Sequence, residues 1–305
     1  MSNAGAPRHD PVPIGEVARP PFARLPDPAS LFHLRAARFA ALAQHHELGR
    51  YLRFMAALAD AQHRSLDRLP NPAIPADDAR QRAAEFGMPP LDRNQFAVDA
   101  AFEATFEHLF SLAQGLEMPE AARAGLFRAR AADPAARDAM VHAVLADSVP
   151  IEALAEHVYV AAALQVHFAR MAAHLDTKSL VPVSDGACPV CGGPPVSSMV
   201  VGWHGAHGTR FCACALCATL WNYVRIKCTL CGSTKGIGYL EIDGGGEAVK
   251  AETCDSCRGY VKILHQHQDP SLEPVADDVA TLGLDLMVRD AGYRRGSVNP
   301  FLLGY

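Results

Sequence analysis

Eight of the nine cysteines form four Cys-x-x-Cys pairs, and this pattern constrains the fold more than any other feature of the sequence. All four pairs lie between Cys188 and Cys257, and no cysteine precedes them. A Cys-x-x-Cys turn places two sulfur atoms on one side of a tight loop, so two such turns can surround one metal ion with four thiolates. In a compartment that keeps thiols reduced, such pairs hold metal more often than they form disulfides.

The cysteine region is an internal repeat. A shift of 40 positions places each of the first four paired cysteines on one of the last four, and it places Gly192 on Gly232. Twenty-two residues separate the two turns in each copy. The sequence therefore predicts two copies of one metal-binding unit.

Two assignments of the pairs to metal sites are open. The duplication favours sequential pairing, because a duplicated unit should bind metal within itself. Site one then has the ligands Cys188, Cys191, Cys214 and Cys217, and site two has Cys228, Cys231, Cys254 and Cys257. The alternative joins the two inner pairs to each other and the two outer pairs to each other. Four thiolates suit zinc and a single iron ion alike, so the ligand set does not choose the metal.

Other candidate ligands in this region are expected not to bind metal. Cys212 belongs to no pair, and we expect a small core residue beside the turn, with a reactive thiol as the alternative. His204 and His207 lie in a glycine-rich loop, and His265 and His267 follow the last turn. We expect these four histidines to face solvent or to pack, rather than to complete a site.

Upstream of the cysteines, apolar residues recur with a helical period from residue 27 to about residue 175. Asp27 followed by Pro28 predicts the start of the first helix, because aspartate caps helix N-termini and proline lacks an N–H that stays unpaired there. Leu31 and Leu34 are expected on its buried side. Proline-rich breaks divide the pattern into six or seven helices.

Beyond Leu180, prolines, glycines and β-branched residues favour short strands between the cysteine turns. A helical pattern returns from Asp277 to about Ala291 and predicts one C-terminal helix. We therefore predict an α+β protein, in which an N-terminal all-α helical domain precedes two tandem rubredoxin-like or zinc-ribbon-like four-cysteine knuckle units. The predicted boundaries are an extended proline-rich arm over 1–28, the helical domain over 29–180, the first unit over 181–227, and the second unit with the C-terminal helix over 228–305.

Composition and motifs exclude several classes of function. The formal charge is −5, from 28 Lys+Arg and 33 Asp+Glu, so no general nucleic-acid binding surface is expected. No apolar stretch of about 20 residues predicts a membrane span, and the first 28 residues read as neither signal peptide nor presequence, so we expect a cytoplasmic protein. The chain has no GxSxG, P-loop or HExxH motif, and we expect no enzyme.

Four stretches of the chain resemble the formate dehydrogenase accessory protein family, often called FdhE. Together they cover about residues 20–304. They are Pro21–Pro26, Tyr51–Phe54 with Ala61-Gln62, the doubled cysteine region with Pro194–Ser198, and the C-terminal stretch from Asp269-Pro270 through Ala276–Asp278 and Gly292-Tyr293 to Asn299–Leu302.

The resemblance implies a cytoplasmic protein that is required for active respiratory formate dehydrogenase. It implies action on the selenium- or sulfur-containing catalytic subunit before export by the twin-arginine route. It further implies two rubredoxin-like metal ions held by the eight paired cysteines, with iron favoured and zinc the alternative. It assigns no role to Cys212. The competing hypothesis is a rubredoxin-like electron-transfer protein, because a four-cysteine iron site can shuttle one electron.

Overall fold

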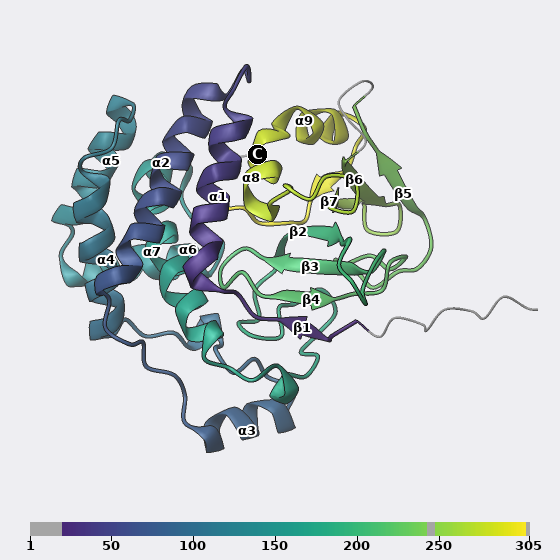
Figure 1. Ribbon diagram of the computed structural model, residues 1–305, viewed down its shortest axis with the longest axis horizontal. Coiled ribbons are helices and arrows are strands. Elements are labelled where there is room, and N and C mark those ends of the chain that lie inside the picture. The colour runs from purple at the N-terminus through teal and green to yellow at the C-terminus, as the bar shows by residue number, and fades with distance from the viewer. Residues whose placement is uncertain (1–19, 243–247, 303–305) are drawn as a thin grey trace, which may run out of the picture.

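The computed structural model describes residues 20–242 and 248–302, so residues 1–19 of the proposed arm lie outside the described residues. Helices occupy one side of the molecule and a sheet the other (Figure 1). Seven α-helices of the described residues precede the first cysteine: α1 (Pro28–Leu42), α2 (Gly49–Ser65), α3 (Asp77–Glu85), α4 (Ala100–Ala113), α5 (Glu120–Ala131), α6 (Pro134–Leu145) and α7 (Leu154–Ala173).

Local capping sets several helix starts, including the one predicted at Asp27-Pro28. Asp27 accepts a hydrogen bond from the Ala29 amide at 3.1 Å, with Pro28 as the first residue of α1. Asp99 and Asp133 cap α4 and α6 in the same way. Helix α7 is the centre of the helical part, because every residue from Tyr159 to Ala169 is buried. That burial explains why its sequence is apolar almost all round.

One predicted core position of α1 is wrong. Leu34 is 59% exposed, whereas Phe32, Arg35 and Phe39 face the interior. The buried stripe includes a charged residue because Arg35 Nε lies 2.9 Å from Glu273 Oε1. A pattern of apolar residues alone ignores such an arginine, so the predicted buried face of α1 is rotated relative to the observed one.

The sheet has eight strands among the described residues: β1 (Ala23–Arg24), β2 (Pro195–Val200), β3 (Arg210–Cys214), β4 (Leu220–Asn222), β5 (Ile237–Leu240), β6 (Val249–Cys254), β7 (Gly259–His265) and β8 (Arg294–Arg295). Their order is β1-β4-β3-β2-β7-β6-β5, with β8 paired to the start of β7.

The two knuckle units are joined more closely than tandem units need to be. Strands β2–β4 come from the first unit and β5–β7 from the second, and each set of three is antiparallel. Strand β2 pairs with β7 in parallel, with Ser198 opposite Ile263 and Val200 opposite His265. The repeat is therefore continuous within one sheet, and both units run in the same direction.

The described end of the proline-rich arm is part of this sheet. Ala23 and Arg24 form β1, antiparallel to β4, with Ala23 opposite Trp221. Ala23 is buried, and Trp221 packs in the same hydrophobic core.

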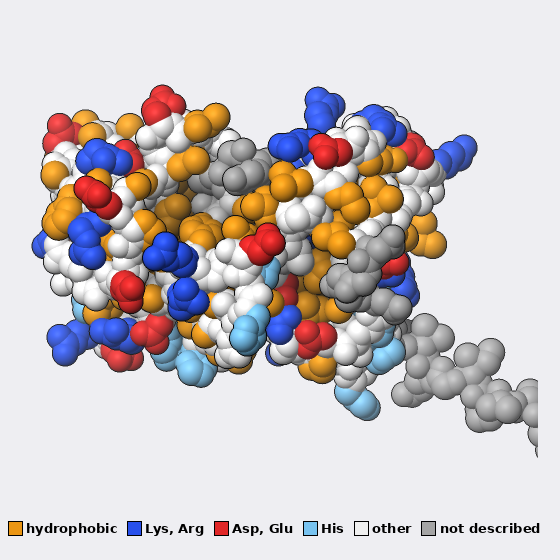
Figure 2. All heavy atoms as spheres, turned by 90° about the horizontal axis from the view of Figure 1, so that it is seen from above, with side chains coloured by type: hydrophobic (Ala, Val, Ile, Leu, Met, Phe, Trp, Pro, Cys, Tyr) orange, Lys and Arg blue, Asp and Glu red, His pale blue; other side chains and the backbone are white. Residues whose placement is uncertain are grey.

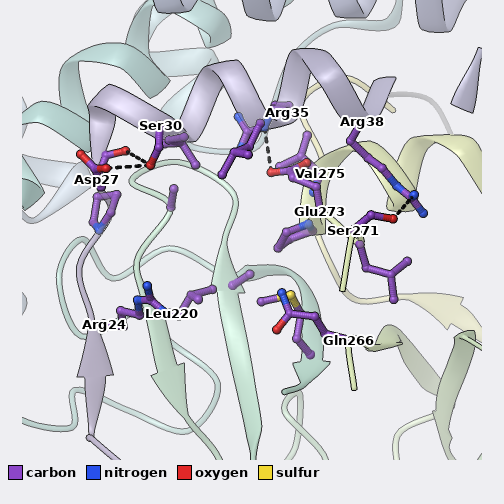
Figure 3. Close-up of a pocket in the computed structure, with 18 of the residues that line it drawn as sticks. Arg24, Asp27, Ser30, Arg35, Arg38, Leu220, Gln266, Ser271, Glu273 and Val275 are labelled. Atoms are coloured by element: carbon purple, nitrogen blue, oxygen red, sulfur yellow. Dashed lines mark hydrogen bonds and ion pairs between the residues drawn. The ribbon is translucent and has the colours of Figure 1, made fainter. Parts of the chain in front are cut away.

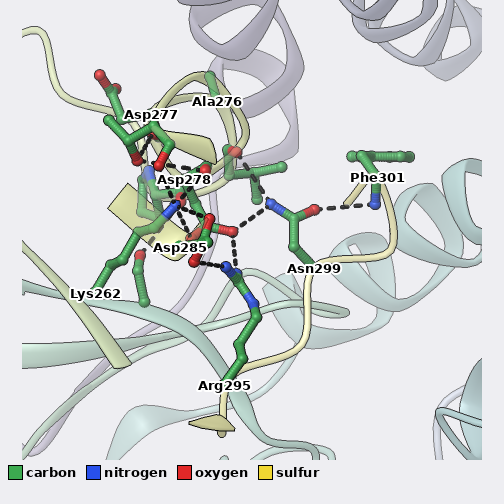
Figure 4. A network of polar contacts seen from close by, with 12 residues as sticks. Lys262, Ala276, Asp277, Asp278, Asp285, Arg295, Asn299 and Phe301 are labelled. Carbon is green, nitrogen blue, oxygen red and sulfur yellow. Dashed lines mark hydrogen bonds and ion pairs between the residues drawn. The ribbon is translucent and has the colours of Figure 1, made fainter. Parts of the chain in front are cut away.

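The single C-terminal helix expected over Asp277–Ala291 is two helices, α8 (Pro274–Ala280) and α9 (Leu282–Asp290). The break lies at Thr281, where φ is −100° and ψ is 36°. The Lys262 ammonium donates to the carbonyls of Asp278 and Thr281 at 2.7 and 3.1 Å, as part of the network in Figure 4. The Lys262 contacts thus coincide with the break between α8 and α9.

The layers meet at α1 and α8: α1 packs on α2, and α8 packs on both α1 and β2 (Figure 1). The largest hydrophobic core contains side chains of α1, α2 and α4–α8 together with the four cysteines of site one. Helix α9 packs on the other half of the sheet through Leu284 and Val288. Among the described residues, no helix is long and apolar enough to cross a membrane.

Candidate metal centres

The structure brings the eight paired cysteines together as two groups of four. In site one, Cys188 Sγ lies 3.6 Å from Cys217 Sγ, and Cys191 Sγ lies 3.4 Å from Cys214 Sγ. All four sulfur atoms lie within 4.8 Å of one another. Each pair of close sulfurs joins one turn of the unit to the other, so the first unit forms its group from its own residues.

Site two repeats this arrangement. Cys228 Sγ lies 3.8 Å from Cys257 Sγ, and Cys231 Sγ lies 3.8 Å from Cys254 Sγ. These four sulfurs also lie within 4.8 Å of one another. Sequential grouping of the pairs is therefore confirmed, and the arrangement that joined the two inner pairs is wrong.

The sulfur–sulfur distances fit a metal ion rather than disulfides. A disulfide has an S–S length of about 2.05 Å. Four thiolates placed tetrahedrally about 2.3 Å from an ion lie about 3.8 Å from one another. The distances of 3.4–3.8 Å match the second geometry, with site one slightly contracted. Cys188, Cys191, Cys214 and Cys217 would hold one ion, and Cys228, Cys231, Cys254 and Cys257 the other.

The backbone of the turns shows why the sequence folds this way locally. Gly192 and Gly232, which follow the first turn of each unit, have φ of +75° and +70°. Ala218 and Arg258, which follow the second turns, have φ of +58° and +56°. All four positions use the left-handed region, which turns the chain and directs amides at the sulfurs. The Leu216 and Cys217 amides, for example, donate to Cys214 Sγ at 3.4 Å.

Crowding of the thiols perturbs their protonation in opposite directions. Burial, with hydrogen bonds from the Cys188 thiol to the neighbouring sulfurs, holds the pKa of Cys188 well above its usual value. Burial also raises the pKa of Cys214, but hydrogen bonds from three thiols outweigh it and hold the pKa well below its usual value. In site two, burial is outweighed by the amides of Cys257 and Ser256, and the pKa of Cys254 falls to about 7. Each group thus contains one thiol whose pKa is lowered by its neighbours.

Site one is attached to the helical part by backbone hydrogen bonds. The Leu91 amide donates to the Val190 carbonyl at 2.9 Å, and the Arg93 amide donates to the Cys191 carbonyl at 3.1 Å. The Arg93 side chain lies against Gly193 and pairs with Asp147 at 2.8 Å. The first turn of site one therefore has a neighbour from the helical part along its outer side.

Site two is attached to different elements. A Cβ atom placed on Gly186 would lie 1.8 Å from the Thr229 carbonyl, so the chain before site one touches the first turn of site two. Lys227 Nζ lies 2.6 Å from Asp185 Oδ1 on the same approach. On the other side, Leu230 packs against Gly259 and Gly296.

The remaining candidate ligands lie outside both groups. Cys212 is buried, and burial raises the pKa of its thiol to about 12, as expected of a core residue. His207, His265 and His267 form a cluster that the sequence did not predict, with ring centroids 6.0 Å apart for His207–His267 and 5.4 Å for His265–His267. The loops that carry them are 58 residues apart in sequence, so no local pattern could have found the cluster.

Two cavities lie against the helical part, one of them also against the sheet. The first has a volume of about 510 Å³ and lies between α1 and the sheet, with Cys214 of site one in its lining (Figure 3). The Arg35–Glu273 ion pair crosses its inner side. The second, of about 430 Å³, is lined by apolar residues of α2, α7 and the C-terminal stretch, including Phe301 and Leu302. On the face shown in Figure 2, hydrophobic side chains gather in a hollow between the two halves of the molecule.

Comparison with known proteins accounts for nearly the whole described chain. Three family models match in succession: FdhE, N-terminal, over residues 20–185; FdhE, central domain, over 187–225; and FdhE, C-terminal domain, over 226–302. The chain is 48% identical to "Protein FdhE homolog" of Rhizobium meliloti (strain 1021) over 299 residues, which is 97% of each chain. It is 36% identical to "Protein FdhE" of Escherichia coli (strain SMS-3-5 / SECEC) over 276 residues, 90% of this chain and 88% of that one.

A solved structure agrees with these matches. The crystal structure of the FdhE protein from Pseudomonas aeruginosa superposes with a TM-score of 0.83 at 32% identity, and the match covers 93% of this chain and 99% of that chain. The doubled cysteine pattern, its folding into two groups of four sulfurs and the matches along the chain agree. The chain belongs to the FdhE family.

Proposed function

We propose that this chain is a non-catalytic accessory protein that acts in the cytoplasm in the maturation of respiratory formate dehydrogenase. The observation that carries the proposal is the pair of four-sulfur groups, each with the spacing of a metal–thiolate centre, in a chain of the FdhE family. Its client is the catalytic subunit, which it binds before export. It inserts into no membrane and binds no nucleic acid.

The metal proposal is one ion in each group, held by the eight paired cysteines. Iron is proposed on the family resemblance, and zinc is the alternative. A four-thiolate ion supplies a rigid crosslink and, if it is iron, a one-electron centre. Metal analysis of the protein purified from its own host tests stoichiometry, and the visible absorption of ferric thiolate separates iron from zinc.

The proposed domain limits are residues 29–180 for the helical domain, 181–227 for the first unit and 228–305 for the second unit with the C-terminal helices. The family models change over between residues 185 and 187 and between 225 and 226, which supports limits near these positions. We propose that the helical domain and the two units act together on the client, since site one shares the largest hydrophobic core with the helices.

Affinity capture from cells respiring on formate tests the client. The catalytic subunit should be recovered with the wild-type protein and lost with Cys228→Ser. The matched control is Cys212→Ala, because Cys212 is a buried cysteine of β3 that belongs to neither group of four. Failure to recover any formate dehydrogenase subunit with the wild-type chain would overturn the proposal. Loss of capture with both variants would point to misfolding rather than to the metal.

A second function, electron transfer, is favoured by one observation: Cys231 of site two is exposed, as the centre of an electron carrier would need to be. An iron-loaded protein that is reduced and reoxidised reversibly, and that passes an electron to the captured partner, would support it. Zinc in both sites would exclude it.

A further inference from the structure

We propose that the two centres differ in access, and that site two is the one at which a donor atom from outside the chain can replace a cysteine on the metal. Site one is buried between the helical part and the sheet. The inference rests on the proposed function in one respect, namely that each group of four cysteines holds an ion.

All four ligands of site one are buried. Its four cysteines are 0–2% exposed and belong to the largest hydrophobic core. The segment Pro89–Arg93 covers the first turn, with the two backbone hydrogen bonds to Val190 and Cys191 and with the Pro89 ring 3.2 Å from a Cβ atom placed on Gly192. Cys188 and Cys191 therefore lie beneath this segment, and Cys214, which is 2% exposed, adjoins the cavity between α1 and the sheet.

Site two has the same ligand set without that cover. Cys228 and Cys254 are buried, but Cys231 is exposed and Cys257 is half-buried. The turn is fixed by Leu230 against Gly259 and Gly296 and by the chain at Gly186 against Thr229, and neither contact covers Cys231, which stays exposed. Cys231 is exposed although it occupies the position of the repeat that corresponds to the buried Cys191 of site one.

The duplication makes this comparison a controlled one. Cys191 and Cys231 occupy the same position of the repeat, and the glycine after each has a left-handed φ. The two differ in what lies against the turn: residues 89–93 of the helical part over Cys191, and solvent over Cys231. The ligand set and the local backbone are therefore the same in both sites, and the cover over the first turn is what distinguishes them.

The class of incoming ligand follows from the metal's preference. Ions that select four thiolates take further soft donors, above all another thiolate. In the exchange, the metal–sulfur bond to Cys231 breaks and the incoming thiolate takes its place. One thiolate replaces another, so the number of donors around the ion is unchanged. The released Cys231 thiolate then takes up a proton from solvent. A partner with an exposed thiolate-class donor would thus be held at site two through the metal itself.

Release of zinc to a colorimetric chelator, 4-(2-pyridylazo)resorcinol, tests the inference on full-length protein loaded with two zinc ions. One ion should leave at least about tenfold faster than the other, because only one site exchanges without local unfolding. Cys231→Ser should abolish the fast phase and keep the slow one. Cys191→Ser, its counterpart in the repeat, should keep the fast phase.

Alkylation of the unaltered zinc protein by iodoacetamide, followed by mass spectrometry, guards against variants that fail to fold. Cys231 should be modified first, then Cys257, with all four cysteines of site one protected. Equal release rates, or early modification of Cys191, would overturn the difference in access. Purified protein that holds no metal at either site would overturn the proposed metal binding instead, so the two failures are distinguishable.

Discussion

Lys262 Nζ lies 2.6 Å from Asp285 Oδ2, and both side chains are buried. Arg295 pairs with the same aspartate and with Asp278, so two cations and two carboxylates form one neutral cluster (Figure 4). The four residues come from β7, α9, β8 and α8. The cluster therefore fixes the C-terminal helices to the second knuckle unit, and it depends on all four charges being present.

Lys262→Met should lower the free energy of unfolding by about 3–5 kcal/mol, because it leaves two buried carboxylates facing one cation. Urea denaturation followed by circular dichroism measures the loss. The double variant Lys262→Met/Asp285→Asn keeps one cation and one carboxylate, and it should be more stable than the sum of the two single losses predicts. Strict additivity of the two substitutions would show that the cluster does not act as a unit.

Gly186→Ala and Gly205→Ala form a matched pair at left-handed positions. At Gly205, φ is +77° and no atom lies within 4 Å of the added Cβ, so the cost should be only the backbone strain of about 1–2 kcal/mol. At Gly186, φ is +72° and the added Cβ would lie 1.8 Å from the Thr229 carbonyl. Strain and clash together should cost about 3 kcal/mol or more. Thermal denaturation should rank Gly186→Ala well below Gly205→Ala, and the reverse order would contradict the contact between residue 186 and site two.

Stability should fall in mild acid in part because of His167. It is buried among Phe96, Phe102 and Phe168, neither ring nitrogen has a hydrogen-bond partner among the described residues, and burial lowers its pKa to about 4. The unfolded chain takes up a proton below about pH 6.5 that the folded chain refuses. Folding free energy is therefore lost as the pH falls from about 6.5 to 4, by about 3 kcal/mol in all.

The acid effect of His167 is separated from loss of metal by comparing variants. His167→Phe should flatten the decline in unfolding free energy between pH 6.5 and 4 relative to the wild type, whereas His204→Phe, at an exposed site, should not. Urea titrations at a series of pH values give the two slopes. Identical slopes for wild type and His167→Phe would show that His167 is not the group responsible.

Cys212→Ala should leave two metal ions bound, because the Cys212 thiol belongs to neither group of four. Cys214→Ala, two positions along the same strand, should lose the ion of site one. Inductively coupled plasma mass spectrometry on the purified variants gives the metal content per chain. Loss of an ion with Cys212→Ala would mean that the ninth cysteine participates in a site.

The sites could be predicted from the sequence because their information is local and repeated. Each Cys-x-x-Cys turn is complete within four residues, and the shift of 40 positions indicates which turns belong together. Helix starts such as Asp27-Pro28 are local for the same reason. The parallel pairing of β2 with β7 was not predictable, since its strands lie about 60 residues apart and no turn connects them directly.

Buried charged residues account for the other differences between the predicted and the observed fold. Arg35, paired with Glu273, lies on the buried face of α1 where Leu34 was expected. The C-terminal helix breaks at Thr281, whose carbonyl accepts from Lys262. In a sequence, a lysine or arginine indicates solvent, and only its distant partner, Glu273 or Asp285, makes burial possible. The exposure of Cys231 is hidden for a related reason, because the cover that Cys191 receives comes from residues about 100 positions upstream.

The position of β1 limits how far the sheet can extend. Both units run in the same direction, so β4 and β7 are equivalent strands of the repeat. The outer edge of β7 pairs with β2, and the equivalent edge of β4 pairs with β1. Strand β5 has no outer neighbour among the described residues. Without β1, the two ends of the sheet would be complementary, and molecules would add to one another head to tail as an open-ended filament. The two-residue strand β1 thus covers the edge of β4 that would otherwise be free to pair with β5 of a second molecule.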